Sequence, residues 1–122
     1  MMYHVLWIIV LHFIADWWLQ TQWQAANKSK NYAALTAHVA TYTFMLCAPA
    51  AAWWSLTWFY WALMNGVLHF ITDAVTSRIT ARHWNAGIPD KVFWNTIGTD
   101  QCIHMVTLIG TYWWMIGGSR EA

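Results

Sequence analysis

Residues 31–72 read NYAALTAHVATYTFMLCAPAAAWWSLTWFYWALMNGVLHFIT and contain no Lys, Arg, Asp or Glu. A helix needs about 20 residues to cross the hydrocarbon core of a bilayer, so this uncharged stretch is long enough for two crossings. Pro49 lies near its middle, where the turn between the two helices is expected. The stretch therefore predicts two consecutive membrane-spanning helices.

The whole chain has a composition that differs from that of a soluble domain. Of its 122 residues, 59% are hydrophobic, 18% aromatic and 9% charged, whereas a soluble domain has roughly 25% charged residues. The net charge of +1 and the few basic residues do not favour nucleic acid as a partner. Cys47 and Cys102 match neither a CxxC pair nor a disulfide framework. The composition predicts an integral membrane protein that does not bind nucleic acid.

Four apolar segments follow one another along the chain. They cover about 3–23, 32–52, 54–77 and 93–116, and each has the length of a transmembrane helix. Met1–Gln20 lacks the basic start and the cleavage site of a secretory signal, so we expect the first segment to be retained as a helix. We predict an all-α fold, an integral membrane four-helix bundle in which residues 1–122 form a single transmembrane domain.

Basic residues gather in the first and third connections between these segments. The first connection carries Lys28 and Lys30, and the third carries Arg78, Arg82 and Lys91. By the positive-inside rule both connections face the cytoplasm. We therefore expect both termini on the non-cytoplasmic side of a bacterial inner membrane. Residues 78–94 are expected to lie along the inner surface as a partly helical loop.

Three of the four expected helices carry a His and an Asp four residues apart, a spacing that brings both side chains to one face of a helix. The pairs are His12–Asp16, His69–Asp73 and Asp100–His104. The order is reversed in the last helix, which runs opposite to the other two. All three carboxylates should therefore lie nearer the cytoplasm, with the imidazoles about 6 Å deeper. His38 of the second helix is expected in the same imidazole layer.

Ionisable side chains at this depth are costly and indicate function. Imidazoles and carboxylates converging from four helices are a mixed nitrogen and oxygen ligand set, suited to a divalent metal, with Zn favoured and Fe or Mn possible. We favour two ions sharing a bridging carboxylate over one ion with several supporting groups, and a set of buried polar residues that only fixes helix packing is the other interpretation. The predicted ligands are His12, Asp16, His38, His69, Asp73, Asp100 and His104.

Neutral polar side chains accompany the pairs. Gln20, Asn65 and Gln101 lie next to them or one turn away, and we expect them to orient carboxylates or hold water at the metal. Lys28 at the cytoplasmic rim is expected to attract an anionic head group of a membrane lipid, unless it only reaches out to solvent. His4 and His83 have no carboxylate four residues away and are not assigned to the site.

The ordered motifs resemble a family of short bacterial and phage membrane proteins of unknown function. The resemblance covers His12 to His104 and rests on H-x-x-x-D-x-x-L-Q from His12, on His69-x-x-x-Asp73 and on Asp100-Gln101-x-x-His104, together with Lys28 and His38. More distantly, the arrangement is similar to the membrane-bound metal-dependent hydrolases of bacteria. That similarity implies hydrolysis by analogy only. The chain has no G-x-S-x-G motif, so a covalent acyl-enzyme route is not expected.

The leading functional hypothesis is a metal-dependent integral-membrane hydrolase that acts on a lipid or lipid-linked ester or phosphoester at the cytoplasmic leaflet. A metal-activated water would be the nucleophile, and one of the candidate catalytic carboxylates, Asp16, Asp73 or Asp100, would act as general base. A proton or divalent-metal transporter or channel is the first alternative. A noncatalytic phage or bacterial membrane interaction protein with a structural metal is the second. A homo-oligomer is compatible with each of these.

Overall fold

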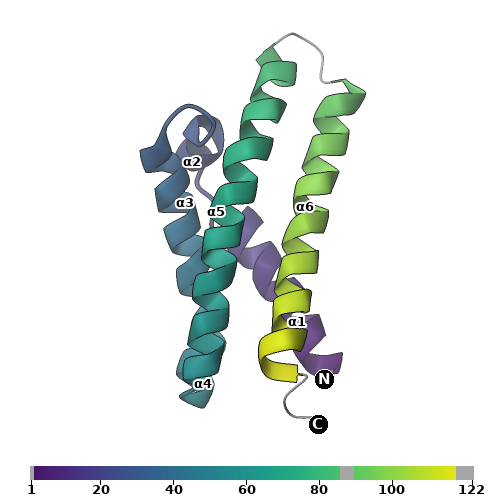
Figure 1. Cartoon of the computed structure of the whole chain (residues 1–122). Coiled ribbons are helices and arrows are strands. Elements are labelled where there is room, and N and C mark those ends of the chain that lie inside the picture. The colour runs from purple at the N-terminus through teal and green to yellow at the C-terminus, as the bar shows by residue number, and fades with distance from the viewer. Residues whose placement is uncertain (1, 86–89, 118–122) are drawn as a thin grey trace.

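The computed structural model describes residues 2–85 and 90–117, and over these residues it consists of helices joined by short turns, with no strand (Figure 1). This confirms the all-α prediction. Two of the helices end in a wider π-helical turn, named η1 and η2. The elements are α1 (Met2–Phe13), η1 (Ile14–Trp18), α2 (Gln22–Asn27), α3 (Tyr32–Leu46), α4 (Ala48–Trp53), α5 (Leu56–Asn85), α6 (Lys91–Tyr112) and η2 (Trp113–Gly117).

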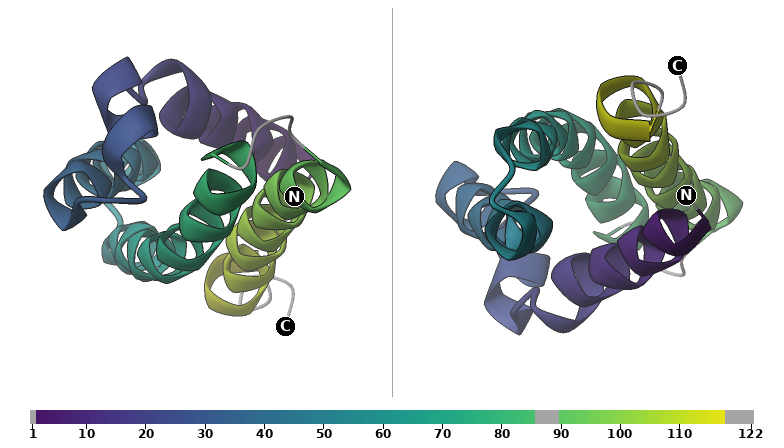
Figure 2. Two further views of the ribbon diagram at one scale, coloured as in Figure 1. Left: turned by 90° about the horizontal axis from the view of Figure 1, so that it is seen from above. Right: turned by 90° about the horizontal axis from the view of Figure 1, so that it is seen from below.

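Four long helical rods form a ring in which each rod packs against two neighbours. The rod of α1 and η1 contacts α3 and α6, and α5 contacts α3 on one side and α6 on the other. Figure 2 shows this closed arrangement from both ends. The short α2 lies outside the ring, against α3. Side chains from all four rods can therefore meet in the centre.

The first rod is shorter than the predicted segment 3–23, because the chain turns after Trp18 and begins a new helix. Thr21 starts α2 with a capping box. Its hydroxyl accepts a hydrogen bond from the Gln24 backbone N–H at 3.1 Å, and the Gln24 side chain accepts one from the Thr21 N–H at 3.0 Å. These bonds satisfy two donors that a helix start leaves unpaired. The turn carries Lys28 towards α5.

The turn between the second and third predicted segments also differs. Pro49 does not lie in the connection between the two rods but in the first turn of the α4 helix. Its missing N–H removes no helical hydrogen bond there. The chain reverses after it, at Trp54, whose φ of 49° is left-handed. Ser55 then caps the next helix by accepting a hydrogen bond from the Trp58 N–H at 3.3 Å.

The third rod is longer than predicted. The sequence predicts its end near Ser77 and a surface loop over residues 78–94, but α5 continues to Asn85 and α6 begins at Lys91. Asp90 caps α6 by accepting a hydrogen bond from the Phe93 N–H at 2.9 Å. Residues 86–89 of the predicted loop lie outside the described residues. The 30 residues of α5 extend about 45 Å, more than the roughly 30 Å of a hydrocarbon core.

The half of the bundle near the chain ends is filled by large apolar side chains. Trp58, Trp61, Tyr42 and Tyr112 are at most 2% exposed there. On the flank of the bundle, Gly66 lets α5 approach α3 closely, because a Cβ at this position would collide with the Thr43 hydroxyl.

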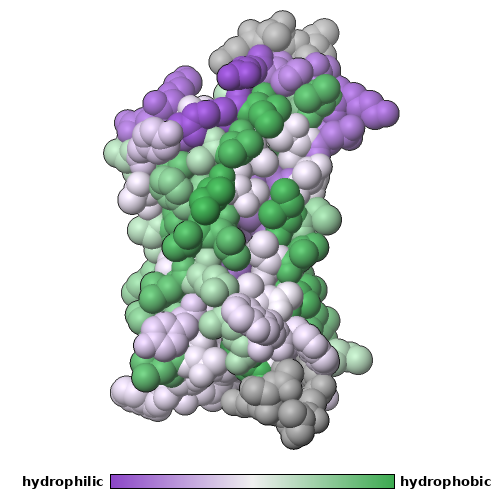
Figure 3. Space-filling view, viewed as in Figure 1, coloured by the Kyte–Doolittle hydropathy of each residue, from purple (hydrophilic) through white to green (hydrophobic). Residues whose placement is uncertain are grey.

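On the face shown in Figure 3, hydrophilic residues gather at the end where α5 stops and α6 begins, and hydrophobic residues cover much of the middle. Within the described residues, one helical segment, Tyr32–Trp53, is long and apolar enough by composition to cross a membrane, while Met2–Trp18 is apolar but shorter. A buried core helix passes the same test, so this finding supports a membrane location only weakly. Length and composition alone do not establish the predicted four spans.

Candidate metal centre

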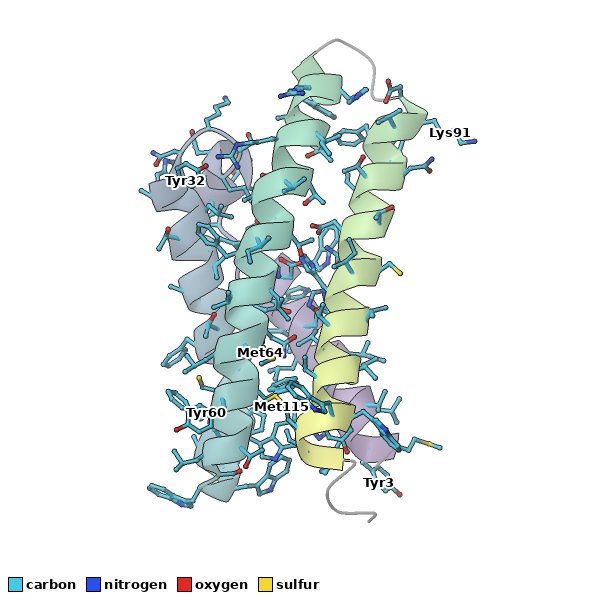
Figure 4. The ribbon with its side chains drawn as sticks, in the orientation of Figure 1. Tyr3, Tyr32, Tyr60, Met64, Lys91 and Met115 are labelled. Carbon is cyan, nitrogen blue, oxygen red and sulfur yellow. The ribbon has the colours of Figure 1, made fainter. Side chains whose placement is uncertain are left out.

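All seven predicted ligands lie in the centre of the bundle, and none is more than 8% exposed. They come from every rod of the ring, so the predicted convergence of these side chains is present. Figure 4 gives the two ends between which they lie, with Tyr32 and Lys91 towards one end and Tyr3 and Tyr60 towards the other. By helix, they are His12 (α1), Asp16 (η1), His38 (α3), His69 and Asp73 (α5), and Asp100 and His104 (α6).

Asp16 occupies the middle of the set, on a widened turn of the first rod. The Leu19 N–H donates to the Ile14 carbonyl at 2.9 Å, a bond that spans five residues and makes the turn π-helical. Such turns interrupt α-helices mostly at functional sites, because they change the direction of the side chains they carry. Asp16 is 5% exposed.

The two oxygens of the Asp16 carboxylate face different pairs of histidines. Oδ1 lies 3.0 Å from His38 Nε2 and 3.4 Å from His69 Nε2. Oδ2 lies 3.6 Å from His12 Nε2 and 3.7 Å from His104 Nδ1. One carboxylate therefore connects two groups of ring nitrogens, which is the geometry expected of a ligand shared between two ions.

A second carboxylate lies beside each pair. Asp73 Oδ2 is 3.5 Å from His38 Nε2 and 3.7 Å from His69 Nε2. Asp100 Oδ2 is 3.5 Å from His104 Nδ1. We name the two sets by these residues: the Asp73 group is His38, His69, Asp73 and Asp16 Oδ1, and the Asp100 group is His12, His104, Asp100 and Asp16 Oδ2.

The spacing between the imidazole nitrogens and the carboxylate oxygens fits a shared ion better than direct hydrogen bonds between these groups. Most of the nitrogen to oxygen distances are 3.4–3.7 Å, beyond good hydrogen bonds. Ligand atoms held about 2.0–2.1 Å from one zinc ion in a tetrahedron lie roughly 3.3–3.4 Å apart. Two triads, Asp16 with His38 and His69 and Asp16 with His12 and His104, have all their ligand atoms within 4.8 Å of one another. These buried clusters could hold a metal ion.

The environment of the histidine ring nitrogens also favours a bound ion. His104 is 1% exposed, and in the described part of the chain neither of its nitrogens has a hydrogen-bond partner. His38 Nε2 and His69 Nε2 approach to 3.1 Å while both point at Asp16. Buried polar atoms without partners are uncommon in folded proteins, and an ion between them would supply the missing partner.

Gln101, predicted as a supporting residue, holds two of the carboxylates. Its amide donates to Asp16 Oδ2 at 3.0 Å and to Asp100 Oδ2 at 3.1 Å. Its carbonyl oxygen lies 2.9 Å from His12 Nε2. A single side chain thus contacts three members of the Asp100 group. Its carbonyl oxygen occupies the Nε2 atom that His12 would offer to an ion, so an ion at this nitrogen would displace that contact.

Tyr42 and Thr76 support the site but were not predicted. The Tyr42 hydroxyl lies 3.0 Å from His12 Nδ1, and its ring stacks on His69 with centroids 4.0 Å apart. The Thr76 hydroxyl donates to Asp100 Oδ1 at 2.6 Å. The available signal was spacing: Tyr42 follows His38 by four residues, and Thr76 follows Asp73 by three.

The other predicted supporting residues take different positions. Lys28 does not stand free at the rim, because its Nζ contacts both oxygens of Asp73 at 3.0 and 3.1 Å. Asn65 does not reach a carboxylate, since its amide donates to the Trp61 carbonyl and to the Thr111 hydroxyl. Gln20 lines a cavity that opens onto the site.

This cavity, of about 490 Å³, leads from the basic end of the molecule to the site. Asp16, Asp73 and Asp100 all line it, whereas none of the four site histidines does. The carboxylates therefore form the floor and the imidazoles lie behind them, in the two layers that the pair order predicts. The cavity volume is in the range of small-molecule sites.

The two histidines left out of the prediction lie elsewhere. His4 Nδ1 lies 2.9 Å from the Tyr112 hydroxyl, among aromatic rings at the opposite end. His83 Nδ1 lies 2.8 Å from Asp90 Oδ2 at the end of α5.

Comparison of the chain with curated proteins and with solved structures finds no match to either. The more distant resemblance to membrane-bound hydrolases therefore gains no support from these comparisons. A family model does match, over residues 5–120, and its description is "Protein of unknown function (DUF3307)". Because this match spans nearly the whole chain, the protein belongs to the DUF3307 family.

Proposed function

We propose that this protein is a membrane-embedded, metal-dependent hydrolase that cleaves a lipid or lipid-linked ester or phosphoester. The observation that carries the proposal is the Asp16 carboxylate, whose oxygens face separate histidine pairs at the floor of an open cavity. Two divalent ions, with Zn favoured and Fe or Mn as alternatives, would fit the Asp73 and Asp100 groups. When bound, such ions activate water and polarise an ester or phosphoester oxygen.

A four-span membrane arrangement is supported by the distribution of side chains. Large apolar residues face outwards on the rods, among them Leu6 at 54%, Val67 at 61% and Val106 at 65% exposed, while the site aspartates and histidines face inwards. An exposed apolar surface of this extent is unfavourable in water. The inward-facing polar residues lower the mean hydropathy of α5 and α6, although their outer surfaces stay apolar.

The orientation follows from the basic residues. Lys28 and Lys30 line the cavity, which opens to the end where Lys91 lies. Arg78 lies over the ring of Tyr32 at the same end (Figure 4). The positive-inside rule assigns this end to the cytoplasm. In a bacterial inner membrane, the site would then act on the cytoplasmic leaflet, with the start of α1 and the end of η2 on the other side (Figure 1).

Within the site, Asp100 is the carboxylate best suited to act as general base. It is the most exposed of the seven site residues, at 8%, and it lines the cavity. Asp73 is less suited, because the charged ammonium group of Lys28 holds both of its oxygens, whereas the groups that hold Asp100 are neutral. Thr76 and Gln101 would hold the Asp100 carboxylate in place while it takes a proton from the attacking water.

A transport pathway is less well supported. On the side of the histidines away from the cavity, the bundle is filled by Trp58, Trp61, Leu108 and Tyr112, each at most 2% exposed. A proton or metal pathway would need polar groups or water through this layer. The layer favours a site that opens at one end.

The test is metal analysis of detergent-purified protein, with hydrolysis assayed on a panel of ester and phosphoester lipids. We expect stoichiometric metal and turnover in the parent, and loss of both in His69→Ala. Asp100→Asn should lose turnover and the ion of the Asp100 group, while keeping the ion of the Asp73 group. Thr57→Ala, an exposed change on the far end of α5, should alter neither.

A folded parent without metal would contradict the proposal. Stoichiometric metal without turnover on any lipid, and site variants that only lower the melting temperature, would instead support an interaction protein with a structural metal.

A further inference from the structure

We infer that the cavity is a binding site for a phosphoryl group, and that its ligand is a phosphate-bearing lipid rather than a neutral ester. This inference rests on the proposed function and specifies its substrate class. It is carried by three features of the cavity wall: a buried hydroxyl without a partner, two lysines, and an apolar side that opens towards the bilayer.

Ser77 supplies the hydroxyl. It lies on α5 one turn beyond Asp73, is 6% exposed, and lines the cavity. Within the described ranges, its Oγ has no hydrogen-bond partner. A buried hydroxyl is normally satisfied by protein or ligand. The Oγ atom itself is covered by protein, and rotation about the Cα–Cβ bond would turn it towards the cavity. A phosphate oxygen above the carboxylate floor, about 6 Å from Asp73 along the helix, would then accept its hydrogen bond.

Lys28 and Lys30 line the wall opposite α5. Lys28 pairs with Asp73, while Lys30 forms no salt bridge within residues 2–85 and 90–117. The two ammonium groups offset most of the charge of the three floor carboxylates. Two divalent ions would then make the cavity strongly positive, which favours a phosphate anion over an uncharged carboxylic ester.

The remaining wall is apolar and reaches the flank of the bundle. Trp17 and Trp84, 50% and 58% exposed, line the cavity together with Phe93 and Ile97. The cavity lies between η1 and α2 on one side and α5 and α6 on the other. In the described part of the chain, no Cα atom of η1 or α2 comes within 8 Å of one in α6.

Only side chains bridge this gap, such as the Trp17 indole, which donates to Gln101 at 3.3 Å. An amphiphile could therefore place its phosphate at the floor and leave its acyl chains against the aromatic side chains in the bilayer. The same chemistry would admit a soluble phosphate, but that ligand would leave the apolar wall uncovered. The wall therefore favours the lipid.

The test measures binding to zinc-loaded protein in micelles of dodecyl maltoside, a detergent without phosphate, and does not require turnover. The probes are phosphatidate, its neutral counterpart diacylglycerol, and inorganic phosphate. We expect phosphatidate to bind at least tenfold more tightly than either. Ser77→Ala should weaken phosphatidate binding roughly tenfold, as expected for a lost hydrogen bond to a charged group. Ser77→Thr should restore it, and Thr57→Ala should have no effect.

The outcomes separate this inference from the proposed function. Metal-loaded protein that hydrolyses a neutral ester lipid and binds diacylglycerol as well as phosphatidate overturns the inference and leaves the hydrolase intact. Equal binding of phosphatidate and inorganic phosphate would show that the site binds phosphate but does not select a lipid. Failure to bind metal overturns both proposals.

Discussion

Lys28 Nζ lies 3.0 and 3.1 Å from the two oxygens of Asp73, although 45 residues separate them in the chain. Asp73 is 2% exposed, and its Oδ2 is also 3.5 Å from His38 Nε2. Lys28 thus holds a positive charge against a carboxylate that an ion in the Asp73 group would also contact. The lysine and the ion would neutralise the same charge.

Lys28→Met should destabilise metal-free protein more than metal-loaded protein. Without metal, the change leaves Asp73 buried and uncompensated, at a cost of about 1–3 kcal/mol. A bound ion would supply the missing charge. Thermal unfolding with and without zinc measures the difference, and Lys30→Met is the control. An equal loss in both states would show that no ion reaches Asp73.

Asp16→Asn should reduce the metal content from about two ions per chain to one or none. The amide keeps the shape of the side chain but offers one neutral oxygen in place of two charged ones, so it cannot serve both groups. Elemental analysis of the purified variant gives the stoichiometry. Asp90→Asn, a change at the exposed cap of α6, should retain the full content. Two ions in the Asp16 variant would exclude a shared carboxylate.

Tyr42→Phe should weaken metal binding roughly tenfold while leaving the stack on His69 in place. The lost hydroxyl lies 3.0 Å from His12 Nδ1 and fixes which ring nitrogen faces the site. Competition with a chelator measures the affinity. Tyr60→Phe, which removes a hydroxyl from a half-exposed tyrosine at the far end (Figure 4), provides the matched control. Equal affinity in parent and Tyr42→Phe would limit Tyr42 to packing.

Gly66→Ala and Gly98→Ala should have opposite effects on stability. A Cβ at Gly66 meets the Thr43 side chain, so separation of α3 and α5 should cost about 1–3 kcal/mol. A Cβ at Gly98 meets nothing within 4 Å, so alanine should gain about 0.5–1 kcal/mol from helix propensity. Chemical denaturation in detergent compares the two variants. Partial recovery in Gly66→Ala combined with Thr43→Ala would identify the contact responsible.

The position of the ligands could be predicted from the sequence because it depends on two regular quantities. A spacing of four fixes the face of a helix, and alternating helix direction fixes the order of the layers, so His12–Asp16 and Asp100–His104 meet at the same height. The same spacing predicted a wrong contact for Asn65, which was expected to support a carboxylate. It lies on the face of His69 but one turn deeper, away from the carboxylates, where it bonds to Thr111 instead.

The contacts of Lys28 could not be predicted, because they depend on where the first rod ends. No Gly, Pro or charged residue interrupts the sequence there, and Trp23 follows the three polar residues 20–22. The sequence does contain one local signal for a new helix, the capping box of Thr21 and Gln24. The prediction of one continuous transmembrane helix over this region overlooks it. A helix that starts after Thr21 places Lys28 near α5, where it contacts Asp73, and not at the cytoplasmic rim of the first helix.

The hydrogen bond from the Leu19 N–H to the Ile14 carbonyl, five residues earlier, determines how His12 is oriented relative to Asp16. Compared with a regular helix, the π-helical turn contains one additional residue, so the helix before the turn is rotated by about 100° relative to the chain after it. Loss of Ile14 or Ala15, which lie between His12 and Asp16, would remove that offset. His12 and Asp16 would then no longer point to the same metal ion, although every ligand would still be present in the chain.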